Sequence, residues 1–366
     1  MSKKKTIVNA ARQIDSHGGI SSVALNLTRQ FKDNGYDVVD FTLTNTGLKP
    51  RKFKSRFFQK LWLFFEIIWA TTVGSIVLFL KYPQKDCIII SHNDFLCGQI
   101  YINHGLHKGM VKQRGGLFVA CVRNPMHLFI YVREEVRHRL GIHSSVVCFS
   151  EQQKKELLYY YPGICSDIYI IPNGVDLDRF SDNSLLPDDF SSLSIPNEER
   201  KILFVGHEFK RKGLRWAIES LGFLSPEWNL IVIGGDQDQW REVSVNLSSA
   251  QLLNRVFFLG KRYDVEKFYR LADCFVLPAD FEPWGLVAIE AIASGTPVVM
   301  TNTGSSSDFI MENVNGFFCS QDPIDIANKI RRTTLLESKI IKDSVIKYSW
   351  SSVIKKYLFL IDKYHV

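Results

Sequence analysis

The chain has 366 residues, of which 46% are apolar and 23% are charged, and its formal net charge is +7. This composition excludes a mainly disordered or collagen-like chain, and a mean hydropathy of −0.03 excludes a protein built mostly of membrane spans. The length predicts two domains. The positive charge is typical of proteins that meet phosphate groups, nucleic acid or anionic lipid, and it leaves these alternatives open.

Short apolar runs alternate with helical patterns along the whole chain. The strands predicted from these runs are 6–9, 38–43, 87–91, 100–103, 146–149, 169–171, 202–205, 230–233, 256–259, 274–277 and 298–300. Runs such as ILFV and LIVI are apolar throughout, which is typical of parallel strands covered on both faces. We therefore expect an α/β chain with two doubly wound domains, 1–174 and 175–345, and a closing amphipathic helix within 346–366.

A basic and apolar segment, 51–80, interrupts this alternation. Its second part, LWLFFEIIWATTVGSIVLFL, carries Glu66 as its one charged residue. The basic residues that precede this part are Arg51, Lys52, Lys54, Arg56 and Lys60. Three interpretations are open: a spanning helix, a core helix of the first domain, or a helix in the membrane interface. A spanning helix would divide the first sheet across the membrane, whereas the basic cluster beside aromatic residues favours docking on anionic lipid.

The cysteines and the first residues predict a cytoplasmic protein. The seven cysteines are odd in number, form no CxxC pair and often lie in apolar runs, so a disulfide framework is not expected. The start, MSKKKTIVNAARQ, lacks the apolar stretch of a secretory signal. We expect the protein in the reducing cytoplasm, associated peripherally with the inner face of the cytoplasmic membrane.

Two glutamates separated by seven residues stand out in DFEPWGLVAIEA. Glu282 follows strand 274–277, at the strand end where open α/β sheets bind ligands. Gly285 permits close backbone approach at the start of the next helix, whose amide groups favour an anion. This order suits a sugar at Glu282, a diphosphate near Gly285 and a ribose at Glu290. For an isolated pair, an ordinary loop acid and a solvated helix residue are the alternative.

The stretch EPWGLVAIEAIASGTPVV resembles the E-x7-E signature of the retaining GT-B glycosyltransferases of family 4. Three other stretches follow in that family's order: SHGG resembles its N-terminal Gly-Gly loop, IPNGVD its interdomain hinge, and VGHEFKRKG its basic loop. The resemblance covers nearly the whole chain and is strongest over 146–320. The spacing of the basic loop is similar to that of bacterial lipopolysaccharide core glucosyltransferases. The resemblance implies two Rossmann-like domains facing a central cleft, with the acceptor bound by 1–174 and the nucleotide sugar by 175–345.

The resemblance also assigns roles to individual residues. It implies that Arg211 and Lys212 bind the donor diphosphate and that Glu282 positions the sugar hydroxyls. It places His104, in YINHG, close to the reactive carbon of the donor sugar. The residues expected to bind the donor are Gly18, Gly19, Gly206, Arg211, Lys212, Gly285, Leu286, Val287 and Glu290.

The expectations for His92, His104 and His207 differ. His92, in SHND, is a weaker candidate than His104, and a hydrogen-bonded structural histidine is the alternative for both. Many relatives have an arginine after the glycine of the basic loop, where this chain has His207. Phosphate contact from that position is therefore not carried over.

The implied activity is that of a retaining, metal-independent hexosyltransferase. A nucleotide sugar, by default a UDP-sugar, would donate to a lipid-linked saccharide in bacterial lipopolysaccharide core, O-antigen or capsule synthesis. We expect no cofactor, and no HExxH motif or Cys/His cluster indicates a metal. The alternatives are another GT-B nucleotide-sugar enzyme, a dinucleotide oxidoreductase, whose GxGxxG fingerprint is absent after the first strand, and a non-catalytic binder of phosphate or nucleic acid. The basic cluster before an apolar segment favours lipid over nucleic acid.

Overall fold

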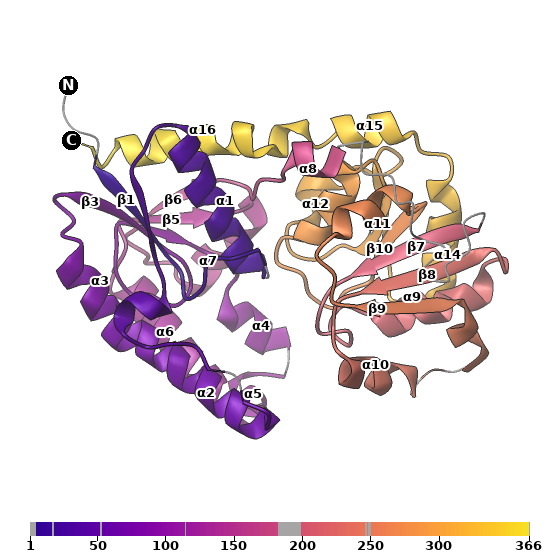
Figure 1. Cartoon of the computed structure of the whole chain (residues 1–366), viewed down its shortest axis with the longest axis horizontal. Coiled ribbons are helices and arrows are strands. Elements are labelled where there is room, and N and C mark those ends of the chain that lie inside the picture. The colour runs from indigo at the N-terminus through magenta and orange to yellow at the C-terminus, as the bar shows by residue number, and fades with distance from the viewer. Residues whose placement is uncertain are drawn as a thin grey trace. The chain divides into compact units, whose positions relative to one another are not determined.

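The computed structural model forms two compact units, Met1–Gly174 with Trp350–Val366, and Val175–Ser349. It describes residues 5–16, 18–51, 53–113, 115–181, 199–245, 247 and 250–365, without the side chains of Arg56 and Gln113. Each unit contains one six-stranded parallel sheet with helices on both faces (Figure 1). The prediction of two doubly wound α/β domains is confirmed.

The sheet of unit 1 has the strand order β2-β1-β3-β4-β5-β6. Its strands are β1 (Thr6–Ala10), β2 (Val38–Phe41), β3 (Cys87–Ser91), β4 (Ile100–Ile102), β5 (Ser145–Cys148) and β6 (Asp167–Ile170). Its helices are α1 (Gly19–Asp33), α2 (Arg56–Trp69), α3 (Ser75–Lys81), α4 (His107–Gln113), α5 (Leu117–Arg123), α6 (Met126–Arg139), α7 (Glu151–Tyr160) and α16 (Trp350–Asp362). Helices α1 and α16 pack together, with the rings of Phe31 and Tyr357 6.3 Å apart. Because α16 returns to this sheet, the chain ends on the unit in which it begins.

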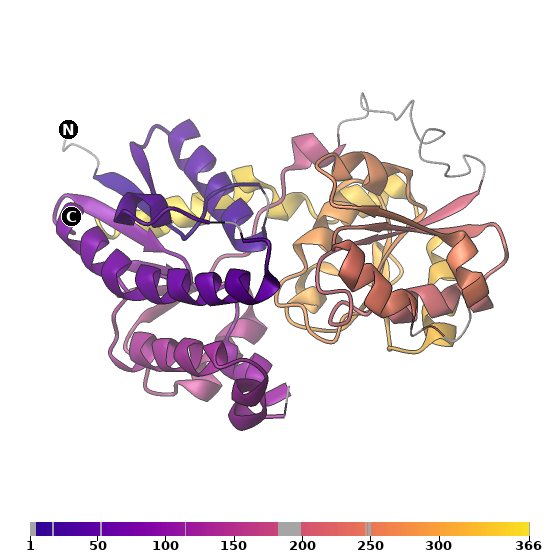
Figure 2. The ribbon, with the colours of Figure 1, turned by 60° about the horizontal axis from the view of Figure 1, so that its bottom comes forward.

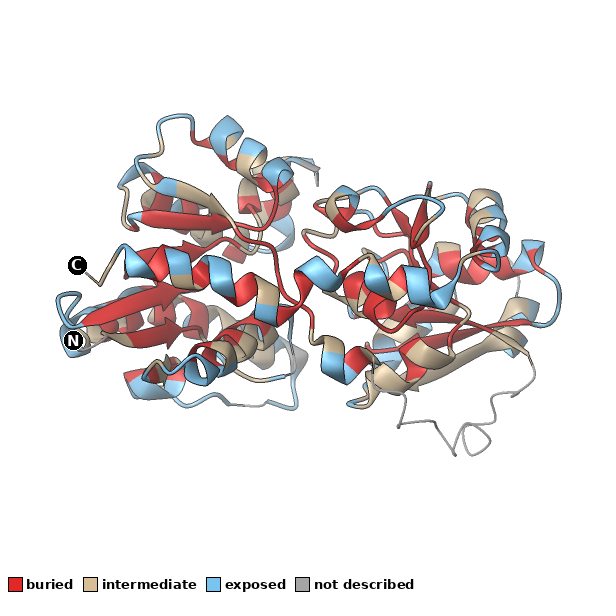
Figure 3. Ribbon diagram, turned by 90° about the horizontal axis from the view of Figure 1, so that it is seen from above, coloured by how far each residue is buried: buried red, intermediate tan, exposed pale blue. Residues whose placement is uncertain are grey.

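The sheet of unit 2 has the strand order β12-β11-β10-β7-β8-β9. Its strands are β7 (Arg200–Val205), β8 (Trp228–Ile233), β9 (Val256–Gly260), β10 (Cys274–Leu277), β11 (Val298–Thr301) and β12 (Gly316–Cys319). Its helices are α8 (Leu177–Ser181), α9 (Leu214–Ser220), α10 (Gln237–Ser244), α11 (Val265–Leu271), α12 (Leu286–Ala293), α13 (Ser306–Phe309), α14 (Pro323–Thr333) and α15 (Ser338–Asp343). The central strands of both units are buried along their length (Figure 3), which explains why their sequences are apolar without alternation.

The sequence does not predict one strand of unit 2, β12. Strand β12 is only four residues long and begins at Gly316, which pairs with Val298 of β11. A Cβ at that position would lie 2.2 Å from the carbonyl oxygen of Val298, so the close strand approach demands glycine. A short strand that opens with glycine carries a weak sequence signal.

The apolar segment forms one long helix against unit 1. Helix α2, a π turn at Ala70–Gly74 and α3 are continuous, and by length and composition alone Phe57–Lys81 could cross a membrane. One face packs into the core of unit 1, where Ala70 and Leu78 contact the cluster that includes Phe95. The other face is exposed. The helix is therefore partly buried on one side and open on the other.

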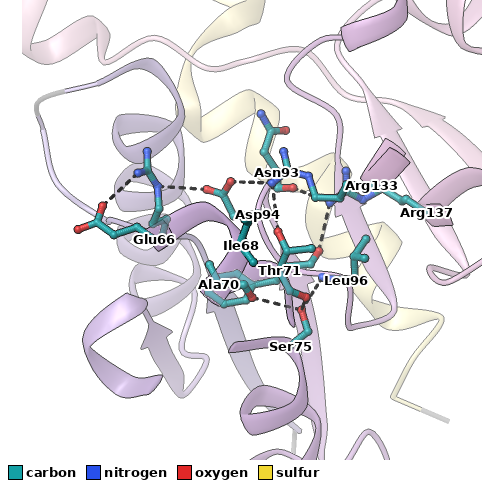
Figure 4. Close-up of polar contacts among 12 residues, drawn as sticks. Glu66, Ile68, Ala70, Thr71, Ser75, Asn93, Asp94, Leu96, Arg133 and Arg137 are labelled. Carbon is teal, nitrogen blue, oxygen red and sulfur yellow. Dashed lines mark hydrogen bonds and ion pairs between the residues drawn. The ribbon is translucent and has the colours of Figure 1, made fainter. Parts of the chain in front are cut away.

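Polar side chains fasten the buried face of this helix to the rest of unit 1 (Figure 4). Arg12, from the loop after β1, lies 3.4 Å from a carboxylate oxygen of Glu66 and 3.5 Å from one of Asp94. Arg133 of α6 donates to Asp94 Oδ1 at 3.0 Å and to Thr71 Oγ1 at 3.3 Å. Buried charges require such partners, and here the protein itself provides them. These contacts do not fit a helix that leaves unit 1 to span a bilayer.

Candidate functional site

The topology of unit 2 brings two loops together at one edge of its sheet. Strands β7 and β10 are neighbours, but the chain continues from β7 toward β9 and from β10 toward β12, in opposite directions. The loops 206–213 and 278–285 therefore diverge from the carboxyl ends of adjacent strands, which is where open α/β sheets bind ligands. The backbone amide of Asp280 donates to the carbonyl oxygen of Arg211 at 2.8 Å and joins the two loops.

Arg211, Lys212 and Glu282, three of the site residues expected from the sequence, meet at this edge. The Nζ of Lys212 lies 3.4 Å, and the Nη1 of Arg211 3.6 Å, from the same oxygen of Glu282, Oε2. That oxygen is buried and accepts no hydrogen bond from the described residues. Arg211 also donates to the carbonyl oxygen of Phe281 and pairs with Glu208 at 2.9 Å. The site thus holds two cations at a carboxylate whose Oε2 accepts no hydrogen bond from the described residues.

Two glycines permit this packing. A Cβ at Gly206 would lie 2.4 Å from Cδ of Lys212, so the lysine stem crosses directly over that glycine. Gly213 has a φ of +74°, and a Cβ there would lie 2.0 Å from the carbonyl oxygen of Pro278. Larger residues would separate the two loops, and the cations would no longer reach Glu282.

His207 has a structural partner in the neighbouring loop. Its Nδ1 accepts a hydrogen bond from the backbone amide of Gly235 at 3.1 Å. Burial, together with Lys212 and Lys261, lowers its pKa below the usual range. The imidazole is therefore neutral at physiological pH and connects the loops after β7 and β8, but it adds no positive charge for an anion.

The remaining predicted donor-binding residues of unit 2 lie at the start of α12 and along it. Gly285 has a φ of +87° and caps the helix, and Leu286 and Val287 form its first turn. The first amides of a helix have no partner within it and favour an anion. Glu290 lies five residues beyond Gly285, a rise of about 7.5 Å along the axis. The phosphate and hydroxyl positions inferred from the sequence are thus spaced along one helix.

Glu290 has polar neighbours from other helices that the sequence does not reveal. The buried hydroxyl of Tyr269 donates to its Oε2 at 3.0 Å. Burial raises the pKa of Glu290 to about 7, against the opposing influences of Tyr269, Arg179 and Lys212. Tyr269 and Arg179 belong to α11 and α8, and no sequence spacing relates them to α12.

The raised pKa of Glu290 predicts a stability change. Because this carboxyl ionises near pH 4.5 when unfolded and near 7 when folded, its charge destabilises the fold increasingly as pH rises through that range. We expect Glu290→Gln to raise the free energy of unfolding by about 1–3 kcal/mol at about pH 8 and to change it little at about pH 5. Denaturant unfolding at both pH values tests this, and an equal effect at both would contradict the raised pKa.

Unit 1 brings two predicted histidines together. His92 follows β3 and His104 follows β4, and Nδ1 of His92 lies 2.8 Å from Nε2 of His104. His92 is 1% exposed, whereas His104 is partly exposed. Gly18 and Gly19 lie at the start of α1, and the carbonyl oxygen of Gly18 accepts from Ser22 of that helix rather than from either histidine. His17 lies outside the described residues.

The structure does not bring together an obvious metal site. Among the residues it describes, no group of three or more His, Cys, Asp or Glu side chains is placed to hold a metal ion. Metal independence remains a prediction from the sequence.

Comparison with known proteins agrees with the resemblance of the sequence to glycosyltransferases. Residues 187–349 match the family "Glycosyl transferases group 1". An uncharacterised glycosyltransferase of Methanocaldococcus jannaschii is 28% identical over 225 residues, 58% of this chain and 58% of that protein. The lipopolysaccharide core biosynthesis mannosyltransferase LpsB of Rhizobium meliloti is 28% identical over 148 residues, 38% of this chain and 42% of that protein. The chain thus spans about half the length of the curated relatives it matches.

Solved structures match over nearly the whole chain. A sucrose-phosphate synthase from Thermosynechococcus elongatus has a TM-score of 0.75 at 20% identity, covering 98% of this chain and 99% of its own. Anabaena HepE in complex with UDP-glucose has a TM-score of 0.67 at 18% identity, covering 98% and 100%. At these identities the similarity shows the fold. Residues 187–349 thus match the model of the glycosyl transferases group 1 family, and the chain has two Rossmann-like units arranged as separate parallel sheets, the fold of these solved structures.

Proposed function

We propose that the protein is a retaining, metal-independent glycosyltransferase that moves a hexose from a nucleotide sugar, with UDP favoured, to a saccharide acceptor. The observation that carries this proposal is the pairing of Arg211 and Lys212 with Glu282 at the switch point of the sheet of unit 2. A leaving nucleoside diphosphate gains negative charge, and two fixed cations stabilise it without a metal ion. Arg211 offers a planar fork to the phosphate oxygens, and Lys212 a point charge.

The same arrangement supports a role for Glu282 at the sugar. Its Oε2 accepts no hydrogen bond from the described residues and is therefore an acceptor for sugar hydroxyls, with Lys212 and Arg211 beside it. In the proposed reaction, the bond between the anomeric carbon and the diphosphate breaks as the acceptor oxygen bonds to the same face of that carbon. The acceptor proton passes to a phosphate oxygen of the leaving group. Glu282 therefore orients the sugar and forms no covalent bond with it.

The names of two similar proteins support the choice of donor and acceptor. One solved relative of the fold is a complex with UDP-glucose, and one curated relative is a lipopolysaccharide core mannosyltransferase. From these two names we propose that the donor is a UDP-sugar. We propose that the acceptor is a lipid-linked saccharide of lipopolysaccharide, O-antigen or capsule synthesis. Nucleic acid is not a partner in this proposal.

Ligand binding tests the proposed donor. Saturation-transfer NMR of the purified protein with UDP-, GDP-, ADP- and dTDP-sugars should show binding of one nucleotide class, and Glu290→Ala should lose it. The anomeric configuration of the product, read from its NMR coupling constant, tests retention. Absence of binding by all four classes, with and without anionic vesicles, would contradict the proposal.

We further propose that unit 1 docks on an anionic membrane surface. The exposed face of the long helix carries Phe57, Phe58, Leu61, Ile76, Phe79 and Leu80, which we call the apolar face. Helix α6 runs beside the long helix (Figure 2), and the rings of Phe64 and Phe129 lie 6.4 Å apart. Helix α5, which packs on α6, carries Phe118, which is 81% exposed. Exposed apolar side chains flanked by basic ones are typical of interfacial binding. The exposed Arg51, Lys54 and Lys60 lie at the N-terminal end of this face.

Vesicle sedimentation tests the docking surface. The triple variant Phe57→Ser/Phe58→Ser/Leu61→Ser should reduce binding to phosphatidylglycerol vesicles by about tenfold or more, because each side chain loses about 1.5–3 kcal/mol of apolar burial. The matched control is Leu335→Ser/Ile340→Ser/Ile346→Ser, which changes exposed apolar residues of unit 2. Equal partitioning of both variants and the unchanged protein would instead favour a core helix beside a solvated basic loop.

A further inference from the structure

A buried row of polar side chains leads from α1 to the histidine pair of unit 1. Asn9 lies in the apolar strand β1 and is 0% exposed. Its Nδ2 donates to the carbonyl oxygen of Ala24 at 2.7 Å and to Oγ1 of Thr28 at 2.9 Å. The Thr28 hydroxyl donates in turn to Asp40 at 2.5 Å. A polar side chain inside a buried parallel strand costs free energy unless every group is bonded, and here each group is bonded.

The direction of each hydrogen bond in this row is determined. A carbonyl oxygen only accepts, so the bond to Ala24 directs Nδ2 of Asn9 toward α1 and its Oδ1 toward His92. Because Oδ1 also only accepts, Nε2 of His92, at 2.9 Å, carries the hydrogen. A neutral imidazole has one N–H, so Nδ1 of His92 is an acceptor. Nε2 of His104, at 2.8 Å, must then donate to it, and Nδ1 of His104 is left without a hydrogen.

Burial keeps the rings of His92 and His104 neutral. Burial lowers the pKa of His92 to about 3, with Asp94 acting weakly in the opposite direction. Burial and the neighbouring His92 lower the pKa of His104 well below its usual range. The ring of Phe149 packs edge-on against His104, with centroids 5.3 Å apart, and restricts its rotation. His104 therefore has one orientation and one tautomer.

We propose that Asn9 and His92 are positioning residues that fix the tautomer of His104, so that its Nδ1 presents a lone pair to a hydroxyl group of the sugar substrate. This inference rests on the proposed function. The described part of the chain offers Nδ1 no hydrogen-bond partner, and His104 is the partly exposed end of an otherwise buried row. An unprotonated nitrogen accepts from a sugar hydroxyl but repels phosphate oxygens, which also only accept. Nδ1 of His104 can therefore accept a hydrogen bond from a sugar hydroxyl but cannot bind the diphosphate, which other residues must bind.

The tautomer can be measured without any substrate. Long-range proton–nitrogen correlation spectra of protein labelled with ¹⁵N-histidine distinguish protonated from unprotonated ring nitrogens, and His104→Gln assigns the signals. We expect Nε2 of His104 to be protonated and Nδ1 unprotonated from about pH 6 to 8. The opposite tautomer, or an exchanging mixture, would overturn the inference. If this spectrum is as expected but no nucleotide sugar binds or reacts, the proposed function is wrong. The inference that Asn9 and His92 fix the tautomer of His104 is then still supported.

Two substitutions of His92 separate positioning from structure. The glutamine amide of His92→Gln reaches the place of Nε2, so the bond to Asn9 is kept while His104 loses its acceptor. We expect a mixed tautomer and a kcat lowered by about 10- to 100-fold, with little change in the donor KM. His92→Asn places a carbonyl oxygen near the former Nδ1, where it can accept from His104, and should recover most of the activity.

The control for these variants is Thr6→Val, at the start of β1, where the hydroxyl donates to Asp37. It should leave both the tautomer and kcat unchanged. Equal loss of kcat in His92→Gln and His92→Asn, in folded protein with an unchanged His104 tautomer, would reduce His92 to a structural role. If neither variant folds, the tautomer of His104 in the spectrum of the unchanged protein still tests the inference.

Discussion

Replacing both Arg211 and Lys212 by alanine is expected to reduce glycosyl transfer by about 10³-fold or more, because removal of even one donor at a developing anion costs about 10²- to 10³-fold. Both cations lie within 3.6 Å of Glu282 Oε2, at the edge of the sheet where the leaving diphosphate is placed in the proposed reaction. The effect should fall on kcat more than on the donor KM, since charge on the diphosphate grows in the transition state. Initial-rate kinetics with a saturating nucleotide sugar provide the measurement.

The same double substitution also removes both cations beside a partly buried carboxylate. The buried Oε2 of Glu282 would then lie without a cation beside it, so the double variant should unfold more easily than the unchanged protein. Adding Glu282→Gln should restore stability without restoring turnover. The control Arg215→Ala changes an exposed arginine of α9 that pairs with Glu219 and stacks over Trp216, and it should retain turnover. A stable double variant that keeps substantial activity would remove the two cations from diphosphate binding.

The fold could be predicted because its signals are local. Strand β3 is five buried residues, CIIIS, and it was predicted with its observed bounds because a continuous apolar run identifies a strand covered on both faces. Strand β12 was missed because its glycine and its four-residue length are explained only by the approach of β11. The long helix was predicted five residues too short at its start, since basic residues at 56 and 60 hide the beginning of α2.

The chemistry of the site could be predicted only where neighbouring residues carry it. Arg211 and Lys212 are adjacent in one loop, and Glu282 lies in a recognisable motif, so their meeting follows from parallel strands that share an edge. Asn9 and Tyr269 contribute through contacts between distant segments. The one sequence signal for Asn9 is a polar residue in the run TIVNA. Tyr269 gives none, because its partner Glu290 is 21 residues away on another helix.

The largest effect on donor binding is expected for Glu290→Ala, which should raise the donor KM by about 10- to 100-fold and change kcat much less. The carboxylate is proposed to accept hydrogen bonds from the ribose hydroxyls, and a hydrogen bond to a charged group contributes about 1.5–3 kcal/mol. The loss acts equally on the bound ground state and the transition state, which is why KM rather than kcat changes. Glu337→Ala, at an exposed position before α15, is the matched control and should bind donor normally.

The pH dependence of donor KM identifies the carboxylate more sharply than truncation does. Because burial raises the pKa of Glu290 to about 7, its charged form dominates above that pH and is lost below it. The donor KM should therefore rise as pH falls through about 7, and Glu290→Gln should abolish this dependence. The hydrogen bond from Tyr269 lowers the pKa of Glu290, so Tyr269→Phe should shift the same profile to higher pH. An unchanged profile in Glu290→Gln would assign the titration to another group, and normal donor saturation in Glu290→Ala would contradict the ribose position.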